Sequence, residues 1–312
     1  MGRPDDKSLL TQGVKIVQDI LETAKLFLKG KLPDLLEDAT PNWKDPNNRT
    51  IFLDRYAHML AKIQLIKAFG EEIIICGEEE SKKSNVVDSN KVVAFIDPID
   101  GTDLLVRNFF NWCSAIAFAL PKEKRIIGTV VGHSSGDIYF ADQDGAYVLG
   151  RRAKRKKRIH RDSSEAKEFC HSSICYYGQK PKSFLTVAQH PGFLERMGVL
   201  KERMAAKEIS AGKKIKGESL DVRIYNFGGN PMMVRIPSGA VDAVFSISGA
   251  AIHDVIPGAY IAVQAGAVFT DLNGNIIDPA DTIQTPEQNI KYILSGSRSL
   301  AEEMKHLLST TK

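Results

Sequence analysis

Residues 97–102 read DPIDGT, directly after the apolar run VVAFI at 92–96. An apolar run of this length is typical of a buried strand, so we expect Asp97 to stand at the carboxyl end of one. Pro98 has a fixed φ and biases Asp97 towards an extended conformation, while Gly101 allows the backbone to approach a ligand closely. The hexapeptide therefore presents two carboxylates, a carbonyl and free N–H groups together, which is the chemistry of a site for hard divalent cations and phosphate.

A second group of acids lies upstream, where GEEE at 77–80 follows the apolar run IIIC at 73–76. Two predicted strands thus end in acids. An isolated pair of aspartates three residues apart would fit an ordinary turn capped by Asp97 and Asp100, but the full hexapeptide with its acidic neighbour favours a metal site. If a short helix begins near Thr102, its N–H groups and dipole favour a phosphate oxygen at the same place.

The composition is that of a soluble globular protein. The chain has 312 residues, 43% of them hydrophobic and 26% charged, which is enough for one large domain or two closely packed ones. The first six residues, MGRPDD, contain no apolar signal core, and no apolar run approaches membrane-spanning length. Four cysteines in so long a chain do not make a disulfide framework. We therefore expect a cytoplasmic protein with reduced cysteines and no membrane partner.

The positive charge is concentrated in one segment. Residues 151–161 read RRAKRKKRIHR and carry eight lysines and arginines without an acid, whereas the whole chain has a net charge of only +4. A nucleic-acid or localisation patch would have such a run, but a solvated hairpin or loop is the favoured interpretation. No aromatic residue is interleaved for base stacking, so a nucleic-acid partner is not expected. The run could also raise the local potential for an anionic substrate.

Apolar periodicity predicts the elements of the N-terminal half. Residues 10–28 and 53–68 have the spacing of amphipathic helices, the second burying a face made of positions 53, 56, 60, 63 and 66. The intervening 41–50 has turn chemistry and should be a surface loop. Runs at 113–120, 126–133, 138–140 and 146–149, separated by turn signals, predict an antiparallel meander.

The C-terminal half alternates between helix and strand. The predicted order is a helix at 193–204, a strand at 222–225, a helix from 231, a strand at 241–245, a helix from 254, a strand at 267–270, and a final strand and helix from 292. This alternation is typical of α/β layers. We expect an N-terminal α+β half, 1–160, and a C-terminal α/β half, 161–312, packed as one compact unit.

A third acid stands at the head of a helix of small and apolar residues. The segment 253–266 reads HDVIPGAYIAVQAG, in which Pro257 is tolerable if it lies in the first turn. Alone, Asp254 would be an ordinary helix cap. However, the chain contains GEE, then DPIDGT, then a helix that begins with an aspartate. This order of motifs resembles that of the inositol monophosphatase and fructose-1,6-bisphosphatase superfamily, and the resemblance extends over nearly the whole chain. The resemblance implies a layered αβαβα sandwich and a Mg²⁺-dependent, lithium-sensitive phosphatase that is often a homodimer.

The resemblance also implies a set of metal ligands. Glu78, Asp97 and the carbonyl of Ile99 match the ligands of a first Mg²⁺. Asp97, Asp100 and Asp254 match the ligands of a second. Two or three ions are implied, and Mn²⁺ should be able to replace Mg²⁺.

Further residues match positions that contact phosphate or the attacking water. Gly101 and Thr102 match a backbone and a hydroxyl that meet the phosphate and the water. Asp54 aligns with the acid that partners this threonine, the alternative being an exposed acid on the second helix. Glu79 corresponds to a nearby acid that supports the metal ligands.

The substrate side departs from the common pattern. Residues 227–230 align with a substrate-contacting loop, which implies that Gly228 and Gly229 lie at the phosphate; a plain turn before a helix is the alternative. His253 stands where relatives have tryptophan, and FSISG at 245–249 lacks the glutamate with which inositol phosphatases bind hydroxyls. The substrate therefore stays open.

The leading hypothesis is a Mg²⁺-dependent phosphate monoester hydrolase acting on a small phosphorylated metabolite. An inositol phosphate, a sugar phosphate such as fructose 1,6-bisphosphate, or a 3′-phosphonucleotide would fit. The reaction would be in-line attack by a metal-activated water that Thr102 and Asp54 orient and deprotonate. The alternative is a catalytically idle relative that binds or regulates a partner through the basic segment 151–161.

Overall fold

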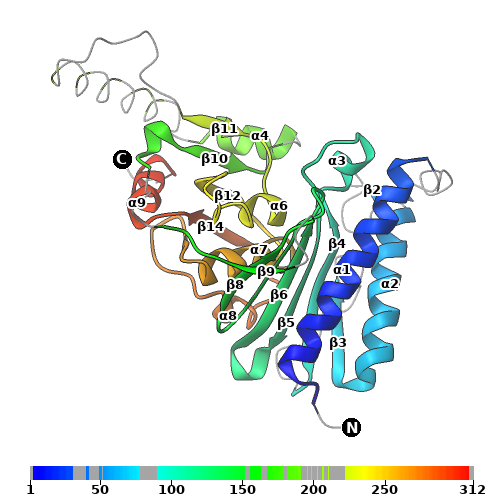
Figure 1. Cartoon of the computed structure of the whole chain (residues 1–312). Coiled ribbons are helices and arrows are strands. Elements are labelled where there is room, and N and C mark those ends of the chain that lie inside the picture. The colour runs from blue at the N-terminus through cyan, green and yellow to red at the C-terminus, as the bar shows by residue number, and fades with distance from the viewer. Residues whose placement is uncertain are drawn as a thin grey trace.

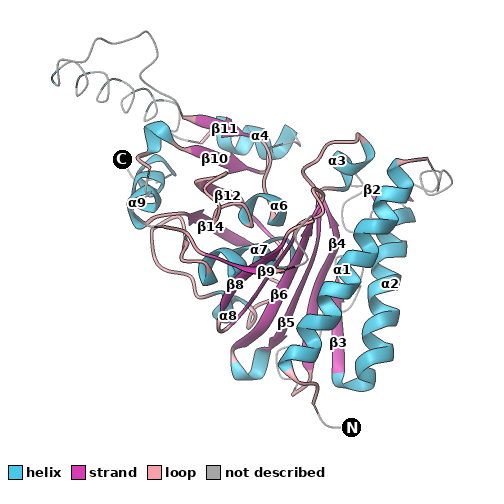
Figure 2. Cartoon of the chain, viewed as in Figure 1, coloured by secondary structure: helices cyan, strands magenta, loops and turns pink. Residues whose placement is uncertain are grey.

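A computed structural model of the chain gives its fold. It describes residues 3–30, 40–41, 49–50, 52–77, 90–151, 155–162, 167–178, 181–190 and 222–308, together with the single positions 195, 198, 202, 206 and 210. Two sheets alternate with three layers of helices (Figures 1 and 2). The predicted αβαβα sandwich is confirmed. Most of the helix predicted at 193–204 lies outside the described residues.

The larger sheet has seven strands in the order β3-β4-β5-β6-β7-β8-β9. β3 is parallel to β4, and every later pair is antiparallel, so the predicted meander is confirmed. The basic run contributes the exposed edge strand β9. The strands span Ile73–Gly77 (β3), Val92–Asp100 (β4), Cys113–Leu120 (β5), Arg125–His133 (β6), Ile138–Asp142 (β7), Gly145–Leu149 (β8) and Lys156–Ile159 (β9).

The smaller sheet has five strands in the order β11-β10-β12-β14-β13. β10 is parallel to both of its neighbours, whereas β14 is antiparallel to β12 and β13. The strands span Ser173–Tyr176 (β10), Arg223–Tyr225 (β11), Ala243–Ala250 (β12), Val268–Thr270 (β13) and Ile290–Ser295 (β14). A separate pair, β1 (Thr40–Pro41) and β2 (Arg49–Thr50), occurs at the ends of the segment predicted to be a loop.

Helices cover the sheets on both sides and fill the space between them. α1 and α2 pack on one face of the larger sheet, α6, α7 and α8 lie between the sheets, and α4 and α9 cover the outer face of the smaller sheet (Figure 1). The helices span Asp6–Leu28 (α1), Phe52–Phe69 (α2), Thr102–Val106 (α3), Pro181–Ala188 (α4), Asn230–Met233 (α6), Ile252–Gln264 (α7), Pro279–Thr282 (α8) and Arg298–Leu308 (α9).

The continuous apolar run in β4 is explained by burial on both faces. Val92, Ala94 and Ile96 belong to the core under α1 and α2, whereas Val93 and Phe95 belong to the core that contains α7. A strand covered by helices on both sides needs apolar residues at every position rather than at alternate ones. The middle helix layer is thereby held against the strand that leads into DPIDGT.

The predicted buried face of α2 is partly wrong. Tyr56, Ile63 and Ile66 are exposed, although the apolar spacing placed them in the core. Small side chains allow α2 to approach the sheet and α1 closely, so the helix turns a different face inwards, and apolar residues around its circumference made the choice ambiguous. The buried residues are Leu53, Asp54, Ala57, His58, Ala61 and Leu65. In the part of the chain that the structure describes, no helix is long and apolar enough to cross a membrane.

A buried ion pair ties the segment after β9 to the smaller sheet. The Arg161 guanidinium Nη2 lies 2.9 Å from Asp242 Oδ1, and the two side chains are 3% and 0% exposed. Asp242 Oδ2 also accepts hydrogen bonds from the Ser173 amide at 2.9 Å and from Lys167 Nζ at 3.1 Å. Asp242 therefore has several charged or polar donors in a dry setting, where losing one partner is costly.

We expect Asp242→Asn or Arg161→Met to lower the free energy of unfolding by about 3–5 kcal/mol, because each leaves an uncompensated group in the interior. Guanidinium unfolding measures the change. Glu123→Gln, which breaks the exposed Arg3–Glu123 pair, is the control and should cost less than about 1 kcal/mol. An Asp242→Asn protein as stable as this control would contradict the assignment.

Burial of His133 at the end of β6 predicts a pH dependence of stability. Burial and, to a lesser degree, Arg235 lower the pKa of His133 from 6.5 to about 4, with Asp137 opposing them. The unfolded chain then takes up the proton first, so stability is full above pH 6.5 and falls by up to about 3 kcal/mol as the pH drops to 4. Urea unfolding between pH 6.5 and pH 4 should show a smaller loss of stability for His133→Gln than for the wild-type protein. Equal slopes for the two proteins would refute the prediction.

Candidate active site

A β-bulge brings the two aspartates of DPIDGT to one place. β4 continues to Asp100, so the expectation that the strand ends at Asp97 is wrong. Asp97 pairs with Ala115 and Asp100 with Cys113, so three steps along β4 oppose two along β5. The extra residue lies at 98–99, where a bulge tolerates a proline without an N–H. Residues three apart on a regular strand point to opposite faces, and the bulge shifts this alternation so that both aspartates line one cleft.

Thr102 and Asp54, predicted to act as a pair, are hydrogen-bonded. Thr102 Oγ1 lies 2.9 Å from Asp54 Oδ1 and 3.1 Å from the carbonyl oxygen of Ile99. Gly101, whose φ of 95° is a left-handed conformation favouring glycine, turns the chain from β4 into α3. Asp54 lies in the first turn of α2 and is 7% exposed, so the alternative of an exposed acid is wrong.

Asp254 is the third residue of α7 rather than its cap, because the helix begins two residues earlier than predicted. Asp254 Oδ2 accepts a hydrogen bond from the Ala251 amide at 3.3 Å. Asp254 Oδ1 lies 3.6 Å from Nε2 of the buried His253, and the Asp254 side chain is 36% exposed. The third acid thus faces solvent at the start of the middle helix layer.

The loop before α6 lies directly against Asp100. The backbone N–H of Asn230 donates a hydrogen bond to Asp100 Oδ2 at 2.8 Å. At Gly229, with φ of 75° and ψ of −169°, a Cβ would stand 2.6 Å from Asp100 Oδ2. At Gly228 it would stand 2.7 Å from the Tyr177 backbone nitrogen. Close contacts therefore favour glycine at both positions, beyond what a plain turn would require. Of the two, Gly229 lines the cleft and Gly228 does not.

The three aspartates act electrostatically on the buried thiol of Cys113. Burial, followed by the negative charges of Asp100, Asp97 and Asp254, raises the pKa of Cys113 well above its usual range. Burial, followed by Asp100 and Asp254, also raises the pKa of Tyr292. A cleft of about 840 Å³ opens onto all three acids. Its other lining residues include Ile99, Gly101, Thr102, Tyr177, Lys182, Gly229, Ser246, Ser248 and Asn289.

Two of the predicted acids follow β3 directly in the sequence. Glu78 and Glu79 lie outside the described residues. Among the residues described, no three acidic, histidine or cysteine side chains form a ready-made metal cluster. Asp100 and Asp254 instead each accept a hydrogen bond from a backbone N–H, that of Asn230 and that of Ala251.

Sequence reasoning missed the roles of some residues in and beside the cleft. Asn230, the first residue of α6, is fully buried against α7 and is not among the lining residues; residues 227–230 were expected to contact the substrate, but nothing in the local sequence connects Asn230 with Asp100 or with α7. Ser246 and Ser248 border the irregular part of β12, where its register against β14 shifts. In the sequence, this part of the cleft was indicated only by residues 245–249, which lack the glutamate that inositol phosphatases have there.

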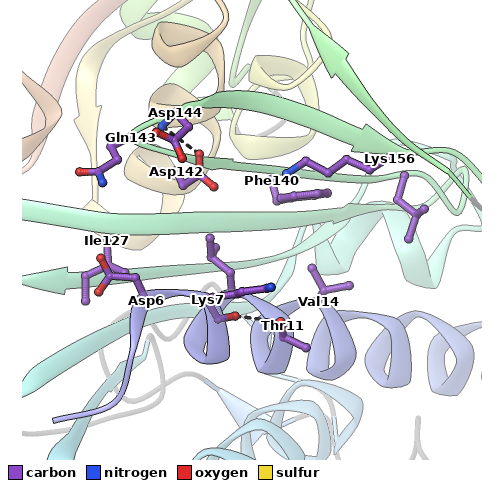
Figure 3. Close-up of a pocket in the computed structure, with 12 residues that line it drawn as sticks. Asp6, Lys7, Thr11, Val14, Ile127, Phe140, Asp142, Gln143, Asp144 and Lys156 are labelled. Atoms are coloured by element: carbon purple, nitrogen blue, oxygen red, sulfur yellow. Dashed lines mark hydrogen bonds between the residues drawn. The ribbon is translucent and has the colours of Figure 1, made fainter.

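A second pocket, of about 570 Å³, lies between α1 and the strands β6 to β9 (Figure 3). Several of its charged groups already interact with other residues of the protein. Asp6 pairs with Arg125 at 2.7 Å, Asp142 caps a turn, and Lys156 Nζ lies 3.4 Å from the centroid of the Tyr147 ring. Three aspartates, Asp6, Asp142 and Asp144, line this pocket, but its described lining has no hydrogen-bonded threonine–aspartate pair like that of the cleft, and it is not a second candidate for the same chemistry.

Solved structures share this fold. An inositol monophosphatase (IMPase) from Thermotoga maritima has 17% identity and a TM-score of 0.68, covering 96% of this chain and 96% of that one. The extragenic suppressor protein SuhB from Bartonella henselae has 14% identity and a TM-score of 0.66, covering 97% and 99%. Staphylococcus aureus IMPase-II with inositol monophosphate bound has 16% identity and a TM-score of 0.63, covering 96% and 92%. It has also been solved with 2′AMP bound.

Gly229→Ala should disturb the cleft, because its new Cβ would meet Asp100 and its backbone angles are in a region almost restricted to glycine. Gly70→Ala is the control, since Gly70 has φ of 59° with nothing within 4 Å of a Cβ, and strain alone should cost about 1–2 kcal/mol. Guanidinium unfolding should show a clearly larger loss for Gly229→Ala. Equal losses would mean that Asp100 moves aside freely.

Comparison with protein families connects the fold and the cleft. A comparison with curated protein sequences gives no significant match. The model of the inositol monophosphatase family matches residues 23–310, nearly the whole chain and every described residue of the cleft. The chain therefore belongs to the inositol monophosphatase family.

Proposed function

We propose that the protein is a Mg²⁺-dependent phosphate monoester hydrolase acting on a small phosphorylated metabolite. The observation that carries the proposal is that Asp97, Asp100 and Asp254 line the same cleft as Thr102, which is hydrogen-bonded to Asp54. Membership of the inositol monophosphatase family supports a phosphatase.

The donors at the cleft suit a hard cation. They are carboxylate oxygens of Asp97, Asp100 and Asp254 and the carbonyl of Ile99, with no sulfur or imidazole donor among the described lining residues. These residues, together with Glu78, would hold the ions. When bound, Mg²⁺ would neutralise the phosphate, lower the pKa of a water and stabilise the leaving alkoxide.

The chain's own residues would orient the water and move its proton. Thr102 has one hydroxyl proton, which it can donate to Asp54 while its lone pairs accept a hydrogen bond from the attacking water. Asp54 is nearly buried, so its carboxylate is well placed to receive the proton that leaves this water through Thr102. Gly101 and Gly229 let the backbone approach the phosphate, and Gly228 supports the turn behind Gly229. Glu79 would support the metal ligands.

The remaining lining residues of the cleft would suit a substrate that carries hydroxyl groups. Ser246, Ser248 and Asn289 offer neutral hydrogen-bonding groups, Tyr177 offers an aromatic ring, and Lys182 offers a positive charge. An inositol phosphate, a sugar phosphate and a 3′-phosphonucleotide all fit these groups. The ligands of the Staphylococcus aureus relative, inositol monophosphate and 2′AMP, belong to the same chemical range.

A catalytically idle binding protein is the less supported alternative. The side chains of Lys156, Lys157 and Arg158 on β9 are exposed, as an acidic partner would require. However, an idle protein would have no need to keep the Thr102–Asp54 pair beside the acids. The homodimer, the cytoplasmic location and inhibition by Li⁺ stay predictions.

Phosphate release from a panel of phosphorylated metabolites tests the proposal. We expect hydrolysis that requires added Mg²⁺ or Mn²⁺, near-complete loss in Asp97→Asn, and a 10²–10⁴-fold lower kcat in Thr102→Val, because Asp97 would hold both ions and Thr102 would relay the proton. Asp19→Asn, on α1 and away from the cleft, is the matched control and should retain activity. Wild-type turnover by Asp97→Asn would sink the mechanism.

A further inference from the structure

A proline interrupts the helix that bears Asp254. Pro257 is the sixth residue of α7, so the expectation that it lies in the first turn is wrong. It has no N–H to donate to the carbonyl of His253 four residues earlier, and its ring crowds that carbonyl. The His253 carbonyl adjoins Asp254 and is buried, where a polar group needs a partner.

The side-chain amide of Asn230 bridges this break from both sides. Asn230 Nδ2 donates to the His253 carbonyl at 2.9 Å, and the Gly258 amide donates to Asn230 Oδ1 at 2.8 Å. Asn230 is 0% exposed, so water does not compete for either bond. A Cβ at Gly258 would stand 3.0 Å from Asn230 Oδ1, so glycine leaves room for the bridge.

The backbone of Asn230 holds the other acidic element. Its amide donates to Asp100 Oδ2 at 2.8 Å. α6, which begins at Asn230, lies beside α7 between the two sheets (Figure 1). One buried residue therefore contacts the bulged end of β4 and the first turns of α7 at the same time.

We propose that Asn230 is a positioning residue that fixes Asp254 relative to Asp100 by supplying the hydrogen bond that Pro257 removes from α7. The inference rests on the proposed function, in which both carboxylates hold cations. Ion-binding carboxylates must be held to within about 0.5 Å, and groups that orient metal ligands are typically worth 10–100-fold in metal affinity.

The test is a double-mutant cycle on the full chain, stripped of metal, with Mn²⁺ as the probe. Electron paramagnetic resonance and titration calorimetry measure Mn²⁺ affinity well below the unfolding temperature of each variant. Asn230→Ala should weaken at least one class of Mn²⁺ site by about tenfold or more, because the His253 carbonyl loses its donor. Pro257→Ala restores an N–H at position 257, so Asn230→Ala should cost less than about threefold in that background.

Two comparisons separate positioning from general stability. Gln64→Ala removes another amide, one that bonds Gln12 and Asp19 between α1 and α2, and should leave Mn²⁺ affinity unchanged. In Asn230→Ala, activity should recover at high Mg²⁺, so that the Mg²⁺ concentration for half-maximal rate rises more than kcat falls. If Asn230→Ala does not fold, recovery of folding and Mn²⁺ binding in the double variant supports the bridge, and failure to recover overturns it.

The outcomes distinguish the inference from the function on which it rests. If the wild-type protein binds Mn²⁺ and hydrolyses phosphate esters, but Asn230→Ala binds Mn²⁺ equally well and loses only thermal stability, the positioning role is wrong and the proposed function stands. Equal losses of Mn²⁺ affinity on Asn230→Ala in the wild-type background and in the Pro257→Ala background would also overturn the bridge. A wild-type protein that neither binds Mn²⁺ nor releases phosphate would overturn both.

Discussion

Mutual repulsion of carboxylates is the constraint on which the cleft depends. Asp97, Asp100 and Asp254 line one cleft, whose described lining includes a single lysine, Lys182. Like charges in a partly dry setting raise the free energy of the folded state unless dipoles or counter-ions offset them. Backbone amides of Asn230 and Ala251 each hold one carboxylate. A divalent cation would offset the remaining charge far more effectively than these dipoles.

The layered fold supplies rigid supports for these charges. Asp97 and Asp100 come from the larger sheet, Asp254 from the middle helix layer and Asp54 from the outer helix layer. α7 packs against both sheets, so its first turn cannot shift without disturbing two hydrophobic cores. Precision at the cleft therefore comes from elements whose positions are fixed by apolar packing elsewhere.

Much of this architecture could be predicted from local patterns. Continuous apolar runs and turn signals gave the meander, and DPIDGT with Asp254 led to the family and the sandwich. The bulge could not be predicted, because it depends on the pairing of β4 with β5 rather than on residues 97–102 alone. The buried face of α2 was ambiguous because Tyr56, Ile63 and Ile66 are apolar yet exposed. The role of Asn230 depends on contacts with residues 23 and 28 positions away, which no local pattern contains.

The distance along the chain between the acids has a consequence for folding kinetics. The meander is built from neighbouring segments, whereas Asp100 meets Asn230 across 130 residues. The entropy of closing such a long loop is lost before the contact contributes any stability, so we expect the contact between Asp100 and Asn230 to form late in folding. The carboxylates would then begin to repel one another only late in folding. An ion that binds them would chiefly slow unfolding rather than accelerate folding, so it would extend the lifetime of the native state.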